Sequence, residues 1–187
     1  MKATEILMDE HRLIERVLDA LEHSANCLRT DATVRPGFFL EAADFLAGFA
    51  DGCHHRKEEG VLFEEMVASG MPAQQGPIGV MLQEHEQGRA FTRAIREAAR
   101  KLEQGDAQAR SALVASAKGY VALLRDHISR EDEVLFPMAD QLIPPERQDQ
   151  VLRGFNRVEQ HDAGPGAHQR FLALAERLER EAGAIRA

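Results

Sequence analysis

The stretch HHRKEEGVLF (54–63) occurs again in altered form as HISREDEVLF (127–136), and the two align without a gap on Val-Leu-Phe. The alignment puts His54 in register with His127, and Glu58 in register with Glu131. A histidine and a glutamate four residues apart lie on one face of a helix. The repeat therefore predicts two helices that present the same pair of polar side chains.

Apolar residues recur at helical spacing on both sides of each copy. We predict helices over about 4–29, 36–69, 78–104 and 106–143, with Thr4 and Asp106 as N-caps and Pro137 as a kink or an early end. The connections TDATVRPG (30–37) and SGMPAQQGP (69–77) are short. Short links favour antiparallel neighbours, so we expect an all-α fold in which 1–143 form an up-down four-helix bundle.

The remaining residues, 144–187, contain a further amphipathic pattern with Phe171, Leu174 and Leu178 on one face. A unit of some 40 residues is marginal on its own. We therefore expect a C-terminal helical extension that packs on the bundle rather than a separate domain.

Composition limits the function. The 187 residues carry a net charge of −8, which argues against a nucleic-acid partner. No run of apolar residues is long enough for a membrane span, and MKATEILMDEH (1–11) lacks the apolar stretch of a signal peptide. Cys27 and Cys53 do not make a disulfide framework. We expect a cytoplasmic protein with neither a nucleic-acid nor a membrane partner.

Histidines lie on the apolar stripes of the predicted helices. One inward histidine is explained by a hydrogen bond to a backbone carbonyl, but here each of the four helices carries one. Inward His and Glu side chains on facing helices are how bundles build metal sites. The predicted metal ligands are His11, His54, Glu58, His85, His127 and Glu131.

The second helix offers two overlapping pairs, His54–Glu58 and His55–Glu59. The apolar stripe and the internal repeat both favour the first pair. We therefore place His55 and Glu59 on the solvent side or behind the ligands. Two HxxxE pairs and two single histidines suit two metal ions, each with two imidazoles and with both carboxylates as bridges. Imidazole with carboxylate suits iron, manganese or zinc, and Cys53 is expected to be an inert buried thiol.

Four segments resemble the hemerythrin-like HHE cation-binding family: MDEHRLIERVLDAL (8–21), HHRKEEGVLF (54–63), GPIGVMLQEHEQG (76–88) and LLRDHISREDEVLFPMA (123–139). The last two are similar to bacterial repair-of-iron-centres proteins, without their small cysteine-bearing N-terminal domain. The resemblance implies a four-helix bundle with two non-haem iron ions joined by an oxo or hydroxo bridge, in preference to manganese or zinc. The family's ligands fall on the six residues already chosen.

One position departs from the oxygen-carrying hemerythrins, which have HxxxH on the third helix. Here Arg89 stands four residues after His85. This departure predicts one imidazole fewer and argues against reversible O2 carriage. Asp132 has the spacing of the carriers' bridging aspartate, but Glu131 fits the internal repeat better.

Other polar residues receive weaker assignments. Tyr120 either bonds a bridging carboxylate or fills the core with its hydroxyl at a polar neighbour. His161 and His168 flank a loop that we expect to pack on the bundle rather than to bind a second metal. His23 is expected to be partly exposed.

Two functions stay open. The first is a di-iron protein that reacts with O2, peroxide or nitric oxide, in stress response or repair of iron centres. The second is a non-enzymatic iron or oxygen sensor with an unidentified protein partner. Iron storage or donation ranks last, because no cage signature is present.

Overall fold

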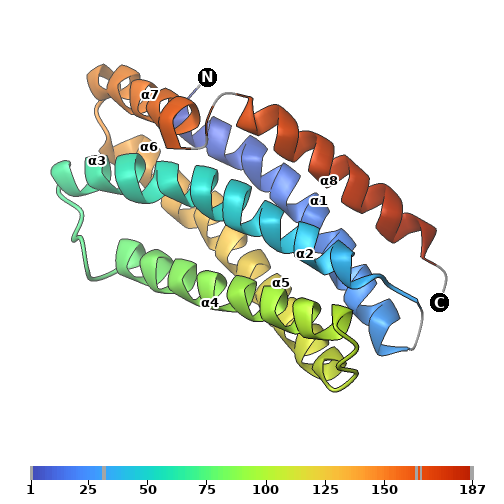
Figure 1. Cartoon of the computed structure of the whole chain (residues 1–187). Helices are drawn as coiled ribbons and strands as arrows, with labels where there is room; N and C mark the ends of the chain where they lie inside the picture. Colours follow the sequence, from blue (N-terminus) through green and yellow to red (C-terminus); the bar gives the residue numbers. More distant parts are fainter. Residues whose placement is uncertain (1, 31–32, 163, 165, 186–187) are drawn as a thin grey trace.

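The computed structural model describes residues 2–30, 33–162, 164 and 166–185, and within these residues it contains helices and no strand. Four long helical rods form the bundle (Figure 1). The first is α1 (Ala3–Arg29) and the third is α4 (Pro77–Glu103). The second rod consists of α2 (Pro36–Phe45), η1 (Leu46–His55), η2 (Glu58–Leu62) and α3 (Phe63–Ala68). The fourth rod consists of α5 (Ala109–Arg130), η3 (Glu131–Leu135) and α6 (Phe136–Leu142). The predicted all-α bundle is confirmed.

The extension begins with the short turn η4 (Pro145–Arg147) and continues through α7 (Gln148–Arg157), η5 (Val158–Asp162) and α8 (Ala167–Ala184). Helix α8 contacts α1 and α2, whereas α7 contacts α1 and η2. Figure 1 shows α8 along the outside of α1, at the side of the bundle away from α4. None of the described helices has the length and apolar character that a bilayer span requires.

Both copies of the internal repeat contain a stretch of π-helix. The segment η2 begins at Glu58 and η3 begins at Glu131, and each lasts five residues. Hydrogen bonds from i to i+5 widen the turn, and such turns are frequent at functional sites. The fourth rod does not end at Pro137, because this residue is the second of α6, which follows η3 directly, and in the first turn its missing N–H is tolerated.

Both predicted N-caps are wrong. Helix α1 is capped at Lys2, and the buried Thr4 instead donates its hydroxyl to Asp140 Oδ1 at 2.8 Å, which fastens α1 to α6. Helix α5 begins at Ala109 after Gln108, and Asp106 Oδ1 accepts the Gln108 N–H at 3.0 Å. Asp106 thus stabilises the turn that precedes the helix.

The apolar core is divided into two clusters. One contains the second half of α1 with α2, η1, α5 and the buried face of α8. The other contains the start of α1 with α3, α6 and α7. His11 lies between Leu7 of the second cluster and Leu13 of the first. A buried polar layer therefore crosses the bundle between two apolar ends.

An aromatic contact joins α8 to the bundle. The ring of Phe171 packs on Phe45 and Phe49, with centroids 6.1 and 5.9 Å away. Gly48 permits this contact, since a Cβ at that position would lie 2.3 Å from Cζ of Phe171. The absence of a side chain at residue 48 thus fixes how closely α8 approaches η1.

We expect Gly48→Ala to lower the free energy of unfolding by about 1–3 kcal/mol, because Phe171 must move out of a packed site. Urea denaturation measures this loss. The matched control is Gly183→Ala in α8, whose added Cβ would meet nothing within 4 Å. A Gly48→Ala variant at least as stable as this control would contradict the packing argument.

Candidate metal centre

The six predicted ligands all lie in the buried polar layer. His11, Glu58 and Glu131 have no exposed surface, and His54, His85 and His127 are each 1% exposed. Their donor atoms gather in two groups, in each of which the atoms lie within 4.8 Å of one another. The first group holds His11, His54, Glu58 and Glu131, and the second holds His55, Glu58, His85 and His127.

Each carboxylate faces both groups. Glu58 Oε1 lies 3.4 Å from His54 Nε2, and its Oε2 lies 3.4 Å from His85 Nε2. Glu131 Oε2 lies 3.2 Å from His11 Nε2, and its Oε1 lies 3.2 Å from His127 Nε2. One oxygen of each glutamate is therefore available to each of two adjacent cation positions. This is the geometry that bridging carboxylates require.

The distances suit metal ligation. The Nε2 atoms of His85 and His127 are 3.1 Å apart. Two nitrogen ligands about 2.1 Å from one ion and at right angles are about 3.0 Å apart. Within the described part of the chain, the buried side-chain nitrogen and oxygen atoms without a hydrogen-bond partner belong to this cluster, except the Ser24 and Ser69 hydroxyls. Both oxygens of Glu58 and of Glu131 are among them. Such orphaned atoms are the expected signature of a site that holds a cation.

The placement of His55 on the solvent side is wrong. Its side chain is 3% exposed, and its ring stacks on that of His85 with centroids 3.8 Å apart. The cause is η1, which ends at this residue. In a π-helix the 3.6-residue period fails, because each turn contains more residues, so the consecutive residues His54 and His55 both face the interior. The cluster therefore contains five imidazoles rather than four.

A carboxylate supports each of the other imidazoles from behind. The Nδ1 atoms of these four rings donate to carboxylates at 2.7–3.0 Å: His11 to Asp132, His54 to Glu10, His85 to Glu59 and His127 to Glu84. His55 Nδ1 lies 3.5 Å from Asp51. A carboxylate on Nδ1 fixes the tautomer and leaves Nε2 for a metal. Sequence analysis placed Glu59 on the solvent side or behind the ligands, and its hydrogen bond to His85 puts it behind a ligand.

The hydrogen bonds between carboxylates and histidine Nδ1 atoms run from one helix to another, and they follow the two-fold pattern of the sequence repeat. Glu10 and Glu84 directly precede the single histidines of α1 and α4, yet each bonds the repeat histidine of another rod. Glu59 and Asp132 directly follow the repeat glutamates and bond His85 and His11. Sequence analysis missed Glu10, Glu84 and Asp51. In the sequence, each of these glutamates is followed directly by a histidine, at 10–11 and 84–85, and this could have marked them as candidates. Their hydrogen-bond partners lie on other helices, however, and spacing along the sequence does not reveal contacts between helices.

Basic side chains stand behind the supporting carboxylates. Arg12 bonds Asp132, and Arg130 bonds Glu84. Arg89 bonds both Asp51 and Glu59, at 2.8 and 2.7 Å. Arg89, at the position where the resemblance to oxygen carriers predicts a histidine, thus orients the support of His85 and the carboxylate nearest to His55.

The buried charges shift the protonation of the metal-free layer. Burial lowers the pKa of His11, but the hydrogen bond to Asp132 and the negative charge of Glu131 outweigh it and raise the pKa to about 9. For His127 burial is likewise outweighed by the charge of Glu131, and the pKa rises to about 10. Burial and the neighbouring His85 and His127 lower the pKa of His55 well below its ordinary value. Positive charge thus compensates Glu131 even without a metal, and a cation can replace the protons.

A third group, made of Glu10, Cys53 and Glu159, also brings possible ligands together. The fully buried Lys57 already occupies this place, because its ammonium bonds both Glu10 and Glu159. Burial raises the pKa of the Cys53 thiol to about 11, which favours its protonated, unreactive form. This group is therefore an ion-pair network in which the Lys57 ammonium already supplies the positive charge.

The remaining polar residues lie outside the cluster. Tyr120 is buried, and the polar neighbour of its hydroxyl is Thr92 rather than a bridging carboxylate. His168 contacts the ring of Phe49, and His161 and His23 are exposed. None of these three histidines joins a candidate metal group among the described residues.

The family model for the hemerythrin HHE cation-binding domain matches residues 2–139, which include every residue of the cluster. The chain belongs to the hemerythrin HHE family. The match and the His/Glu cluster together identify a metal-binding domain of the hemerythrin type.

Curated relatives match this chain over a similar length. The chain is 27% identical over 135 residues to uncharacterized protein Rv1995 of Mycobacterium tuberculosis and to uncharacterized protein Mb2018 of Mycobacterium bovis. The matched region is 72% of this chain and 52% of each relative, so the chain spans about half the length of these proteins.

We expect His55→Ala to weaken metal binding at least tenfold, because it removes a donor from the second group, and loss of a supporting group alone costs 10–100-fold. His54→Ala should have an effect of similar size through the first group. Metal content after equilibrium dialysis measures both.

His23→Ala provides the control, since this exposed residue contacts Cys27 and lies outside both groups. A His55→Ala variant with the same metal content as the control would show that His54 is the histidine ligand of the second helix and that His55 is not a ligand.

Proposed function

We propose that this hemerythrin-type domain holds two iron ions and reacts with small oxidants: O2, peroxide or nitric oxide. The observation that supports this most is the pair of buried carboxylates, each with one oxygen directed to either of two adjacent histidine groups. Two cations side by side with shared carboxylates suit the binding of a ligand of a few atoms. A physiological role in defence against oxidative or nitrosative stress, or in repair of iron centres, follows from this reactivity.

Iron fits this donor set better than zinc does. Structural zinc prefers closed, often thiolate-rich sites, and the nearby Cys53 thiol is not among the donors of either histidine group. Imidazole and carboxylate donors suit iron and also manganese. Iron when bound supplies redox change and open coordination positions, and the buried layer between two apolar clusters supplies exclusion of water.

The chain contributes position and charge to this chemistry. Five imidazoles and two carboxylates hold the cations, and the Nδ1 hydrogen bonds fix the orientation of the rings. Glu58 and Glu131 are engaged as ligands, so neither is free to act as a general base. The protein's part in the reaction is therefore binding, orientation and desolvation.

The fifth imidazole changes the expectation about O2. A deficit of one imidazole argued against reversible binding, but His55 fills that deficit from the second rod instead of the third helix. The second group then has three imidazoles and the first has two, which is the division in oxygen carriers. O2 binding therefore belongs with peroxide and nitric oxide among the reactions to test.

Protein purified anaerobically should contain about two irons per chain and change its visible spectrum on exposure to air, peroxide or nitric oxide. His11→Ala and His85→Ala each remove one donor, from the first and the second group respectively, and each should lose mainly one metal. His168→Ala should keep both. A single zinc, or an intact fold without metal, would contradict the proposal, as would two irons that do not react with any of the three oxidants.

A second candidate, a non-enzymatic iron or oxygen sensor, is favoured by one chain of contacts. Glu159 of η5 bonds Lys57, Lys57 bonds Glu10, and Glu10 accepts a hydrogen bond from His54 at 3.0 Å. A buried ion pair of this kind is sensitive to the loss of one partner. The contacts connect the extension to the first histidine group, so a change at the metal would reach a surface where a protein partner can bind.

If the domain is a sensor, removal of metal should speed proteolysis within η5, the segment that contains Glu159. Glu159→Gln should make the cleavage rate the same with and without metal. Glu179→Gln serves as control, because it breaks the α8 ion pair with Arg16, which lies outside the Lys57 network. Cleavage that does not respond to metal in the unmodified protein would exclude this role.

A further inference from the structure

Four arginines form a basic stripe along one face of α4. Arg89, Arg93, Arg96 and Arg100 follow one another four, three and four residues apart, the spacing at which side chains are neighbours on a helix. At about 1.5 Å per residue the stripe is roughly 16 Å long. Figure 1 shows α4 at the side of the bundle away from α8, and both Arg93 and Arg100 are exposed. The stripe therefore faces solvent rather than the extension.

The outer part of the stripe borders a surface hollow of about 430 Å³. Its lining consists of Arg93, Arg96, Glu97, Arg100, Lys101 and Gln104, so four positive charges meet one negative charge. The whole chain carries a net charge of −8, and this hollow is a local reversal of sign. A surface of one sign concentrates partners of the opposite sign and speeds their association.

Two members of the stripe are already neutralised. Arg89 bonds three carboxylates, and Arg96 bonds Asp44 at 2.7 Å. Within the described part of the chain, the side chains of Arg93 and Arg100 make no hydrogen bond or ion pair. These two arginines lie two helical turns apart, about 10 Å along the axis. The stripe thus offers free positive charge at two positions with a fixed separation.

The stripe works against the stability of α4. Like charges three or four residues apart destabilise a helix, and Arg93 has Arg89 and Arg96 at these distances, while Arg100 has Arg96. Neither Arg93 nor Arg100 gains a partner within the described chain in return. Folding therefore does not account for these two residues, whereas binding of a negatively charged partner does.

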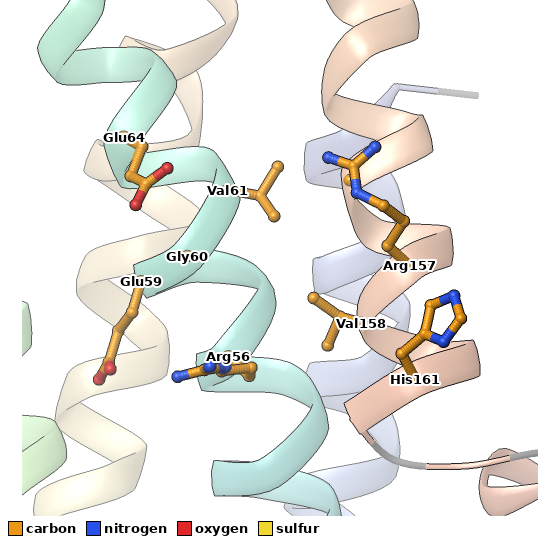
Figure 2. A pocket seen from close by; sticks show the side chains of 9 residues that line it. Arg56, Glu59, Gly60, Val61, Glu64, Arg157, Val158 and His161 are labelled. Carbon is orange, nitrogen blue, oxygen red and sulfur yellow. The ribbon is translucent and has the colours of Figure 1, made fainter.

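A larger pocket, of about 530 Å³, lacks such a surplus of one sign. It lies between η2 on one side and α7 with η5 on the other, and Figure 2 shows Arg157 and Glu64 on opposite sides of it. Its lining contains Arg56 and Arg157 together with Glu59 and Glu64, so these charges balance. The pocket favours neither sign of partner, and its arginines serve as a comparison for those of the stripe.

The spacing of the free charges indicates what kind of anion fits. Glu86 and Glu97 lie beside the stripe, and each is 69% exposed. Duplex DNA carries one negative charge per about 1.7 Å of its axis, so it would also place phosphates against these glutamates. An acidic helix presents carboxylates at intervals of one or two turns. It can therefore meet Arg93 and Arg100 while it avoids the glutamates.

We propose that the basic stripe is a docking surface for an acidic helix of a partner protein, two of whose carboxylates pair with Arg93 and Arg100. Docking requires no metal, so this inference goes beyond the proposed function. Arg89, at one end of the stripe, bonds Glu59, which supports His85. The docked partner therefore lies next to the second histidine group, on the side of the bundle away from α8.

Two peptides and two double variants test the docking. Both peptides are fluorescein-labelled alanine-based helices with four glutamates. In the stripe peptide the glutamates are four, three and four residues apart, and in the control peptide they are spread around the helix. Arg93→Gln with Arg100→Gln removes the free charges of the stripe. Arg153→Gln with Arg157→Gln removes two exposed charges from α7, and glutamine keeps a high helix propensity in both cases.

Fluorescence anisotropy at low ionic strength measures binding to the full chain, with and without metal. The stripe peptide should bind more tightly than the control peptide. The stripe variant should weaken its binding about three- to tenfold, and the α7 variant should change it little. The difference should vanish near 1 M salt, where the screening length is about 3 Å. The stripe variant should melt at no lower a temperature than the unmodified chain, because it loses repulsion only.

A charge exchange gives the sharpest check. Arg93→Glu with Arg100→Glu should reject the stripe peptide and bind a version of it with lysines in place of the glutamates. Equal binding of the two glutamate peptides would overturn the proposal, and so would equal weakening by the stripe and α7 variants.

Two further outcomes would assign the surface to another occupant and overturn the proposal. One is a dimer of the unmodified chain in analytical ultracentrifugation that the stripe variant dissociates. The other is duplex DNA that binds through Arg93 and Arg100 more tightly than the stripe peptide does. A chain that docks the stripe peptide but contains no iron would refute the proposed function and support this inference.

Discussion

The burial of Glu58 and Glu131 between five imidazoles is the constraint on which the rest of the structure depends. Both carboxylates have no exposed surface, and none of their oxygens has a hydrogen-bond partner. An unpaired buried carboxylate is very costly, so the layer needs positive charge from protons or from metal. The division of the core into two apolar clusters, the supporting carboxylates and the cations behind them all follow from this one requirement.

The two-fold character of the repeat explains how so many charges share one layer. Each repeat glutamate begins a π segment, and the acid after it bonds the single histidine of a neighbouring helix. Each single histidine is preceded by an acid that bonds a repeat histidine. Every rod therefore both gives and receives support, and each of these four rings is held by a carboxylate from another rod. Such mutual support keeps the ligands in place when the metal is absent.

The sequence could predict the helices, the bundle and the buried position of six cluster residues, because these depend on the 3.6-residue period and on the repeat. It could not predict His55, since the π-helix of η1 changes the period at the residue that decides between the two pairs. Glu10 and Glu84 were missed for another reason: their partners His54 and His127 lie on other rods, and packing across a bundle has no local signature. Thr4 failed as a cap because Asp140, distant in sequence, accepts its hydroxyl.

The symmetry of the layer is broken at one position, and this break gives the two groups different numbers of imidazoles. The repeat residue that corresponds to His55 is Ile128, which packs in the first apolar cluster. One side therefore receives a third imidazole where the other receives an apolar contact. On that same side Arg89 bonds Glu59, which supports His85, and Asp51, the carboxylate nearest to His55. The second group therefore offers a cation three imidazoles and the first only two, whereas the first group alone is joined to the extension through Lys57.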